Sequence, residues 1–324
     1  MGDDRLESDS QQDCGGYVPG SADVPAYRVF GPCPTILPVM IAVPHAGRCY
    51  PSALLRNLRS PEATALKLED RYVDKLAHAV ARDTGVSLLV AQAPRAMIDL
   101  NRAPEDVDWE MFSRSGAGPR RPQEGTLPSR RARSGLGLIP RRLPGLGELW
   151  RRPHDERELK ERIEAVHRPY HERLAGMLAE LRDRWGCALL IDLHSMPPLA
   201  SRTNQPAPEF VLGDRFGAAS HGSLVAAAFA HFAAADRVVA HNRPYAGGYV
   251  LERHARPQHG LHALQIEIDR SRYLDPRLKE PGPGFDATVA VLSTLVRALA
   301  AAVAELGRPG GYRHDIGDWP MAAE

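Results

Sequence analysis

Histidines follow two apolar runs of this chain. The run Ile36–Val43 leads into His45, and the run Cys187–Leu193, interrupted by Asp192, leads into His194. Short apolar runs of this kind are typical of buried strands in an α/β sheet, and such sheets bind ligands at the carboxyl ends of their strands. The plainer alternative is that each histidine hydrogen-bonds within its own turn. We treat both as candidate site residues.

A carboxylate stands on a third segment with strand character. Residues Leu261–Ile268 alternate between apolar and polar, which predicts a strand with Gln265, Glu267 and Asp269 on one side. A carboxylate in an apolar strand needs a salt bridge or a task such as general base catalysis. Both explanations stay open for Glu267 on this pattern alone.

Acidic residues cluster at the start of a predicted helix. Leu66–Arg82 has helical spacing of its apolar residues, and Glu69, Asp70 and Asp74 lie near its beginning. The helix dipole favours acids there, which is the plainer explanation for them. Asp70 and Asp74 are four residues apart, so we expect them on one helix face.

An amide and a guanidinium are adjacent at Asn101 and Arg102. Together they can present hydrogen-bond donors to a carboxylate. The ordinary alternative is a surface arginine that pairs with a nearby aspartate such as Asp106. Arg95, which follows a predicted strand at Val86–Val90, is a further candidate for substrate binding.

These residue types are the parts of a metal-dependent amidase. Two histidines and a carboxylate around an open coordination position make a catalytic zinc site. Zinc lowers the pKa of water and polarises a carbonyl, a glutamate can pass a proton to the leaving amine, and an arginine can hold a substrate carboxylate. The combination predicts one zinc ion per chain.

A second pair of histidines, His167 and His171, lies in the clearest helical pattern, Asp155–Arg184. Histidines at this spacing share a helix face and can bind zinc. Pro169 stands between them, however, and no glutamate follows His167 directly. We therefore expect that this pair does not bind a metal.

The composition argues against a nucleic-acid or membrane partner. The 324 residues carry a formal net charge of +1, so no overall field attracts nucleic acid or an anionic membrane. No apolar run is expected to reach the length of a membrane span, and Met1–Ser10 lacks the pattern of a signal peptide. Cys14, Cys33, Cys49 and Cys187 lack zinc-binding spacing and are expected to be reduced thiols of a cytoplasmic protein.

The chain predicts one catalytic α/β domain at residues 26–307, between a disordered tail at 1–25 and a second tail at 308–324. Residues 103–152 are rich in arginine, proline and glycine, which indicates an insertion with little regular structure. Such a segment could contact RNA or phosphate. No aromatic residues alternate with its arginines, so we expect a mobile surface loop.

An ordered set of segments resembles the N-formylglutamate amidohydrolase family. The set spans roughly residues 36–300 and is more specific than any one member. The family is similar in fold to zinc carboxypeptidases and aspartoacylase, which implies a three-layer αβα architecture with a mixed central β-sheet. The matching segments are Val43–Gly47, Asp70–Leu76, Ile98–Arg102, Pro169–His171, Asp192–Ser195, Gly247–Tyr249, Gly260–Glu267 and Arg272–Asp275.

The resemblance also implies roles for individual residues. By it, His45 and His194 would be zinc ligands and Glu267 the general base. Asn101 and Arg102 would bind a substrate carboxylate. The oligomeric state does not follow from the resemblance.

The third metal ligand departs from the pattern of the related enzymes. Zinc carboxypeptidases take a histidine and a glutamate from an H-x-x-E motif, but Arg48 stands at the glutamate position here. The carboxylate must therefore come from elsewhere. We assign it to Asp70, with Glu69 and Asp74 as alternatives.

The activity implied by the resemblance is hydrolysis of N-formyl-L-glutamate to formate and L-glutamate. One alternative is a zinc amidase that acts on another N-acyl amino acid or a small peptide-like amide. Another is a non-catalytic protein that binds a small anion or a partner on the same fold. An intact set of His45, His194 and Glu267 argues against the last.

Overall fold

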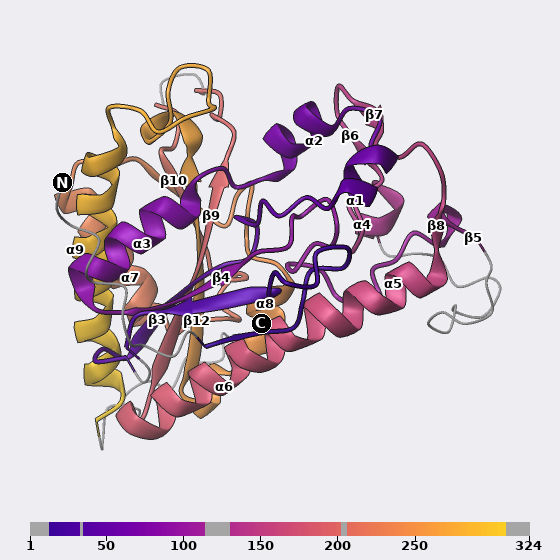
Figure 1. Ribbon diagram of the computed structural model, residues 1–324. Helices are drawn as coiled ribbons and strands as arrows, with labels where there is room; N and C mark the ends of the chain where they lie inside the picture. Colours follow the sequence, from indigo (N-terminus) through magenta and orange to yellow (C-terminus); the bar gives the residue numbers. More distant parts are fainter. Residues whose placement is uncertain (1–12, 33–34, 114–129, 202–205, 309–324) are drawn as a thin grey trace, which may run out of the picture.

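A mixed sheet forms the centre of the computed structural model (Figure 1). The structure describes residues 13–32, 35–113, 130–201 and 206–308. Within them the sheet has eight strands in the order β1-β2-β4-β3-β9-β12-β10-β11. The strands are β1 (Cys14–Gly15), β2 (Tyr27–Phe30), β3 (Val39–Val43), β4 (Ser87–Ala91), β9 (Ala188–Met196), β10 (Phe210–Gly213), β11 (Val239–His241) and β12 (Leu261–Asp269).

The middle of the sheet is parallel. β4, β3, β9 and β12 are neighbours that run in one direction, while β2 and β10 run against them on either side. Strands buried on both faces read as near-continuous apolar runs, which is why β3, β4 and β9 follow from the sequence. Because the parallel strands are adjacent, their carboxyl ends meet at one edge of the sheet.

Helices cover both faces of this sheet, and each face has its own buried apolar cluster. On one face lie α3 (Val73–Thr84), α7 (Gly222–Ala234) and α9 (Phe285–Leu306) (Figure 1). On the other lie α6 (Arg168–Trp185) and α8 (Tyr249–His254). The expected α/β class, with three layers and a mixed sheet, is confirmed.

The helix α9 corrects one expectation from the sequence. It has 22 residues and is long and apolar enough, by length and composition, to cross a membrane. In the structure it packs against α3 and α7 with Leu295, Leu299 and Val303 fully buried, as a core helix does.

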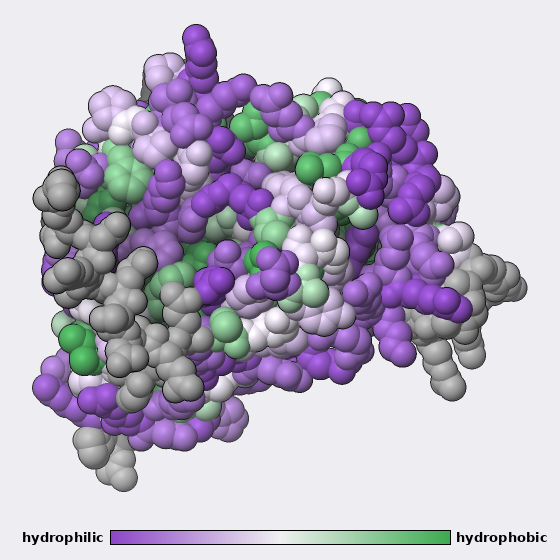
Figure 2. Space-filling model, viewed as in Figure 1, coloured by the Kyte–Doolittle hydropathy of each residue, from purple (hydrophilic) through white to green (hydrophobic). Residues whose placement is uncertain are grey.

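The face shown in Figure 2 is mostly hydrophilic, with hydrophobic residues in small separate patches.

The acidic cluster near α3 does not lie on one helix. α2 (Pro61–Leu68) and α3 are separate, and the backbone between them turns at Tyr72, whose φ is 59°. Asp70 lies in this connection, where its backbone N–H donates to the carbonyl oxygen of His45 at 3.0 Å. The expectation of one continuous helix with Asp70 and Asp74 on the same face is therefore wrong.

The chain is ordered further toward its N-terminus than expected. Residues 13–25 were assigned to a disordered tail, yet β1 pairs with β2 and Val18 is fully buried. Cys14, Cys49 and Cys187 form no disulfide with one another. The expectations for residues 1–12, for Cys33 and for residues 309–324 lie outside the described residues.

The described parts of residues 103–152 contain only short elements, but they are not a surface loop. Met111, Ile139 and Trp150 are buried in the apolar cluster beneath α6. The expectation for residues 114–129 lies outside the described residues. The short elements are η1 (Trp109–Met111), β5 (Phe112–Ser113), α4 (Arg130–Arg133), β6 (Arg142–Leu143) and β7 (Gly147–Glu148).

Candidate metal centre

His45, Asp70 and His194 converge at the carboxyl ends of β3 and β9. Asp70 Oδ2 lies 2.8 Å from His194 Nδ1 and 3.5 Å from His45 Nδ1, and one ligand atom of each residue lies within 4.8 Å of the others. All three residues are buried, with 2–3% of their surface exposed. Ligands around a tetrahedral zinc ion are separated by about 3.4 Å. The spacing therefore fits a small divalent cation.

Carboxylates hold the outer ring nitrogens of both histidines. His45 Nε2 lies 2.7 Å from Asp99 Oδ1, and His194 Nε2 lies 2.9 Å from Asp192 Oδ2. Carboxylates accept hydrogen bonds, so each Nε2 carries a proton, and Nδ1 is the atom directed toward Asp70. The Nδ1 atom of His45 is buried without a hydrogen-bond partner. Metal-binding histidines have this arrangement, with a carboxylate behind the ring.

The charges around this cluster favour a cation at its centre. Burial works against the charged form of His194, yet Asp192 and Asp70 raise its pKa well above the usual value. Burial alone would raise the pKa of Asp70, but the neighbouring imidazoles of His194 and His45 lower it. Positive charge between these groups is therefore stabilised, whether a proton or a metal ion supplies it.

The neighbouring acids are engaged elsewhere. Both oxygens of Asp74 accept from Arg48, with Nη1 to Oδ1 at 2.9 Å, and Glu69 Oε2 lies 3.2 Å from Arg71 Nη1. The turn between α2 and α3 explains this separation, because it aims Asp70 at the histidines and leaves Asp74 on the helix. The structure brings Asp70, and neither alternative, to His45 and His194.

Glu267 lies on the strand beside His194. In the parallel pairing of β9 and β12, Glu267 is opposite His194 and Gln265 is opposite Asp192. Gln265 Nε2 donates to Glu267 Oε1 at 3.0 Å. Burial raises the pKa of Glu267 to about 7. A carboxyl group that titrates near neutral pH is suited to general base catalysis.

A cleft of about 420 Å³ opens over this cluster. The loop at residues 244–248, which includes Tyr245, forms part of its wall together with Arg270. Every site residue predicted from the sequence lines this one cleft: His45, Asp70, Arg95, Asn101, Arg102, His194 and Glu267.

Asn101 lies between the histidine cluster and α8. Its Nδ2 atom is 3.4 Å from His194 Nε2 and 3.3 Å from Gln265 Oε1. Its Oδ1 atom accepts from the backbone N–H of Val250 at 2.9 Å. A Cβ atom added at Gly248 would lie 2.4 Å from Asn101 Oδ1, so only glycine lets the two segments approach this closely.

The two arginines of the cleft also support its structure. Arg95 Nε donates to Asp99 Oδ2 at 2.9 Å, and Arg102 Nε donates to the carbonyl oxygen of Leu136 at 2.9 Å. Their side chains remain 21% and 11% exposed, at the cleft. Burial alone would raise the pKa of Asp99, but Arg95 and Arg102 hold it well below the usual value. Asp99 therefore stays charged behind His45.

Three buried charged residues of the site were missed from the sequence. Asp99 and Asp192 each interrupt a run of apolar residues, and a buried carboxylate in such a place needs a partner. This pattern in the sequence could have identified both. No comparable pattern marks Arg270. It donates to Ser195 Oγ at 3.1 Å and to the carbonyl oxygen of Glu69, and so holds the connection that carries Asp70.

A buried glutamate beside a cluster able to hold a metal ion, at the carboxyl edge of a mixed sheet, is a site of the amide-hydrolase kind. The chain belongs to the N-formylglutamate amidohydrolase family, whose model matches residues 37–274. The resemblance carried by the sequence segments is therefore confirmed.

Individual relatives cover most of the chain. N-formylglutamate deformylase of Pseudomonas putida is 30% identical over 280 residues, 83% of this chain and 94% of that protein. The deformylase of Pseudomonas aeruginosa is 29% identical over 278 residues, 82% of this chain and 93% of that protein. The crystal structure of N-formylglutamate amidohydrolase from Ralstonia eutropha JMP134 superposes with a TM-score of 0.76 at 30% identity, covering 86% of this chain and 98% of that chain.

Proposed function

We propose that this protein hydrolyses N-formyl-L-glutamate to formate and L-glutamate and that it requires one zinc ion. The names of the relatives support the substrate. One observation carries the metal requirement: two imidazoles backed by carboxylates turn their Nδ1 atoms toward a shared aspartate. We also propose that the protein works in the cytoplasm, where cysteines that form no disulfide, such as Cys14 and Cys49, are usual.

His45, Asp70 and His194 would hold the metal. A zinc ion bound there supplies a Lewis acid for the amide carbonyl and lowers the pKa of water. Asp99 and Asp192 fix the orientation and protonation state of the two rings. The buried, unpartnered Nδ1 atom of His45 is the feature of this structure that a metal would explain.

Glu267 would act as the general base. Its carboxylate takes a proton from the attacking water as the new C–O bond forms at the formyl carbon. It then delivers that proton to the amide nitrogen as the C–N bond breaks, so that formate and the free amine of glutamate leave. Gln265, hydrogen-bonded to Glu267, keeps the carboxylate on the cleft side of β12.

Arg102, Asn101 and Arg95 would bind and orient the substrate. N-formylglutamate carries two carboxylates, and charge-assisted hydrogen bonds from guanidinium groups are the natural way to recognise them. The arginine side chains are already held by protein contacts, so little side-chain freedom is lost on binding.

The test combines metal analysis with a substrate screen. Elemental analysis of purified protein should find one zinc ion per chain, and a chelator should remove both zinc and activity. A screen of N-formyl and N-acetyl amino acids should give the highest kcat/KM for N-formylglutamate. A protein that binds no metal and gains nothing from added zinc contradicts the zinc site. Preference for another N-acyl amino acid contradicts the substrate assignment and favours the broader zinc amidase.

A further inference from the structure

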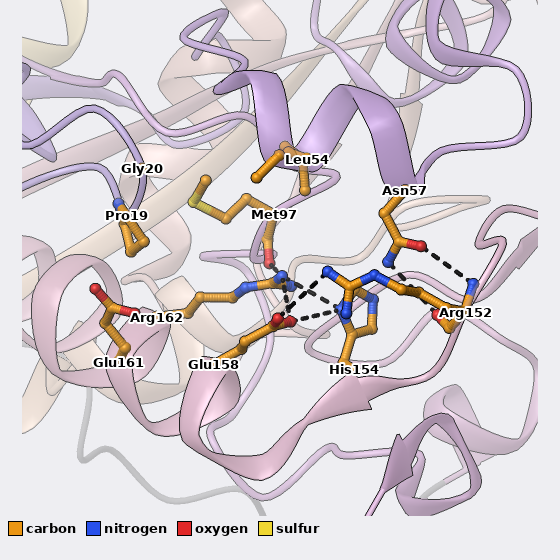
Figure 3. A pocket seen from close by; sticks show the side chains of 11 residues that line it. Pro19, Gly20, Leu54, Asn57, Met97, Arg152, His154, Glu158, Glu161 and Arg162 are labelled. Carbon is orange, nitrogen blue, oxygen red and sulfur yellow. Dashed lines mark hydrogen bonds and ion pairs between the residues drawn. The ribbon is translucent and has the colours of Figure 1, made fainter.

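Three buried side chains of one helical segment contact the backbone of residues 97–102. The segment runs through α5 (Glu156–Arg162), a π-helical turn (Ile163–His167) and α6. Figure 3 shows the first contact, in which Arg162 reaches Met97; both residues line a small cavity. The contacts are Arg162 Nη1 to Met97 O at 3.2 Å, His171 Nε2 to Leu100 O at 3.0 Å and His167 Nε2 to Arg102 O at 2.9 Å.

The backbone that these side chains hold carries groups of the cleft. Asp99 supports His45, Asn101 lies beside His194, and Arg102 lines the cleft. The held carbonyls belong to Met97, to Leu100 just before Asn101, and to Arg102 itself, so a shift of any of them moves the backbone that carries these side chains. Misplacing a substrate-binding group by about 1 Å costs on the order of 100-fold in rate.

The contacts also define the protonation of the histidines. A backbone carbonyl only accepts, so the Nε2 atoms of His167 and His171 carry protons and donate. The Nδ1 atom of His171 then accepts from His254 Nε2, which lies 2.9 Å away. Burial lowers the pKa of His167 to about 4, that of His254 to about 3, and that of His171 well below its usual value. The three rings are therefore neutral near pH 7 and add no charge behind the arginines of the cleft.

The helix and α8 hold this backbone from two sides. His254 lies on α8, and the backbone N–H of Val250, in the first turn of α8, donates to Asn101 Oδ1. The π-helical turn immediately precedes α6 and ends at His167. Such turns are rare and occur mostly at functional sites.

We propose that Arg162, His167 and His171 form a donor clamp that positions Asp99, Asn101 and Arg102 for catalysis. They are positioning residues, because they act on the cleft through the backbone of residues 97–102. The catalytic part of this proposal rests on the proposed function, whereas the hold on the backbone does not. If the histidines only satisfied buried carbonyls, their loss would lower stability and leave the kinetic constants unchanged.

The decisive comparison is between two substitutions of His167. His167→Leu removes the donor, and His167→Gln keeps an N–H at a similar reach. We expect His167→Leu to lower kcat/KM for N-formylglutamate by about 10- to 100-fold, mainly through KM because Arg102 moves, with zinc content unchanged. His167→Gln should recover kcat/KM to within about threefold, since it restores the same hydrogen bond.

A matched control lies in the opposite layer. His231 on α7 also contacts a backbone carbonyl, that of Val291, at 3.1 Å. His231→Leu should change the melting temperature and leave kcat and KM as they are. An equal loss of kcat/KM in the His167 and His231 variants would overturn the clamp, and so would failure of His167→Gln to recover activity.

Hydrogen exchange tests the clamp without relying on activity. The backbone N–H groups of Asp99, Asn101 and Arg102 are all hydrogen-bonded, so they are expected to exchange slowly. They should exchange faster in His167→Leu and remain slow in His231→Leu, even if N-formylglutamate is not the substrate. Unchanged exchange in His167→Leu would overturn the proposal. If that variant does not fold, His167→Asn, which is too short to reach the carbonyl, carries the same expectation.

Discussion

Two groups of buried histidines lie on either side of residues 97–102 and have opposite chemistry. His45 and His194 are held at Nε2 by carboxylates and turn Nδ1 toward Asp70. His167 and His171 point Nε2 at backbone carbonyls instead. Burial is the same in both groups, at or below 2% exposure.

The difference lies in the partners and not in the residue type. Asp192 and Asp70 raise the pKa of His194 against the effect of burial, whereas burial lowers the pKa of His167 to about 4. An imidazole between carboxylates attracts a cation, and a buried one that points at a backbone carbonyl is a neutral donor. Spacing along a helix or a strand therefore identifies a histidine pair without identifying its role.

The largest effect should follow from removing a histidine of the first group. His45→Ala or His194→Ala should lose zinc and activity together while the fold is retained, because each deletes a ligand at the edge of the sheet. Elemental analysis, activity and circular dichroism check this. Full activity in either variant would show that this histidine has only a structural role, and the two groups of histidines would then not differ in function.

Glu267→Gln should keep zinc and lower kcat by at least about 100-fold, the usual scale for loss of a general base. The amide preserves the shape of the side chain, so KM should change little. Steady-state kinetics with parallel metal analysis provide the measurement. A variant with kcat near that of the wild type would assign the proton transfer to another group.

Asp99→Asn should weaken zinc binding by about 10- to 100-fold, since the carboxylate behind His45 is replaced by a neutral amide. Asp74→Asn is the matched control, because Asp74 pairs with Arg48 and lies away from the histidines. Competition with a chromophoric chelator gives both affinities. Weaker binding in the Asp74 variant would assign the carboxylate ligand to Asp74 instead of Asp70.

Lowering the pH should destabilise the protein, partly because His167 takes up a proton when the chain unfolds. Its pKa is about 4 in the folded state and about 6.5 in the unfolded chain, so below pH 6.5 the unfolded chain binds a proton that the folded protein does not. The free energy of unfolding therefore falls as the pH drops from 6.5 toward 4, by about 2 kcal/mol at pH 5. Urea unfolding at pH 7 and pH 5 should show that His167→Gln loses about 2 kcal/mol less than wild type. Equal losses would mean that His167 is protonated in the fold.

Arg102→Ala should raise KM for N-formylglutamate by about tenfold, the lower end for a charge-assisted hydrogen bond. We expect the lower end because backbone carbonyls already take up two of its donors. The diamide of the same substrate should lose little, since it has no carboxylate. If both compounds suffer equally, Arg102 does not bind the substrate carboxylate.

The sequence is informative where a pattern is local. Continuous apolar runs mark β3 and β9 and place His45 and His194 at one edge, and the 3.6-residue period marks α6. The same period misleads around Asp70, because apolar spacing continues across the turn at Tyr72. A left-handed tyrosine has no signature in the amino-acid pattern.

Contacts between distant segments cannot be predicted from the sequence alone. Asp99 and His45 are 54 residues apart, and His171 and His254 are 83 residues apart. Each contact depends on strand order and helix packing, so one chain without its fold does not show which histidine meets a carboxylate. Within one strand the situation improves, because the alternation of β12 already puts Gln265 and Glu267 on the same side.

The pairing of β9 with β12 also limits how this protein can evolve. His194 and Glu267 are opposite each other, and Leu264, Ile266 and Ile268 face the helices on the other side. Deleting a single residue early in β12 would turn Glu267 into the apolar layer and an isoleucine toward the cleft. Length changes are therefore expected in the connections between elements and not within β9 or β12. Substrate preference can diverge there while the strands that carry the histidine and the glutamate keep their frame.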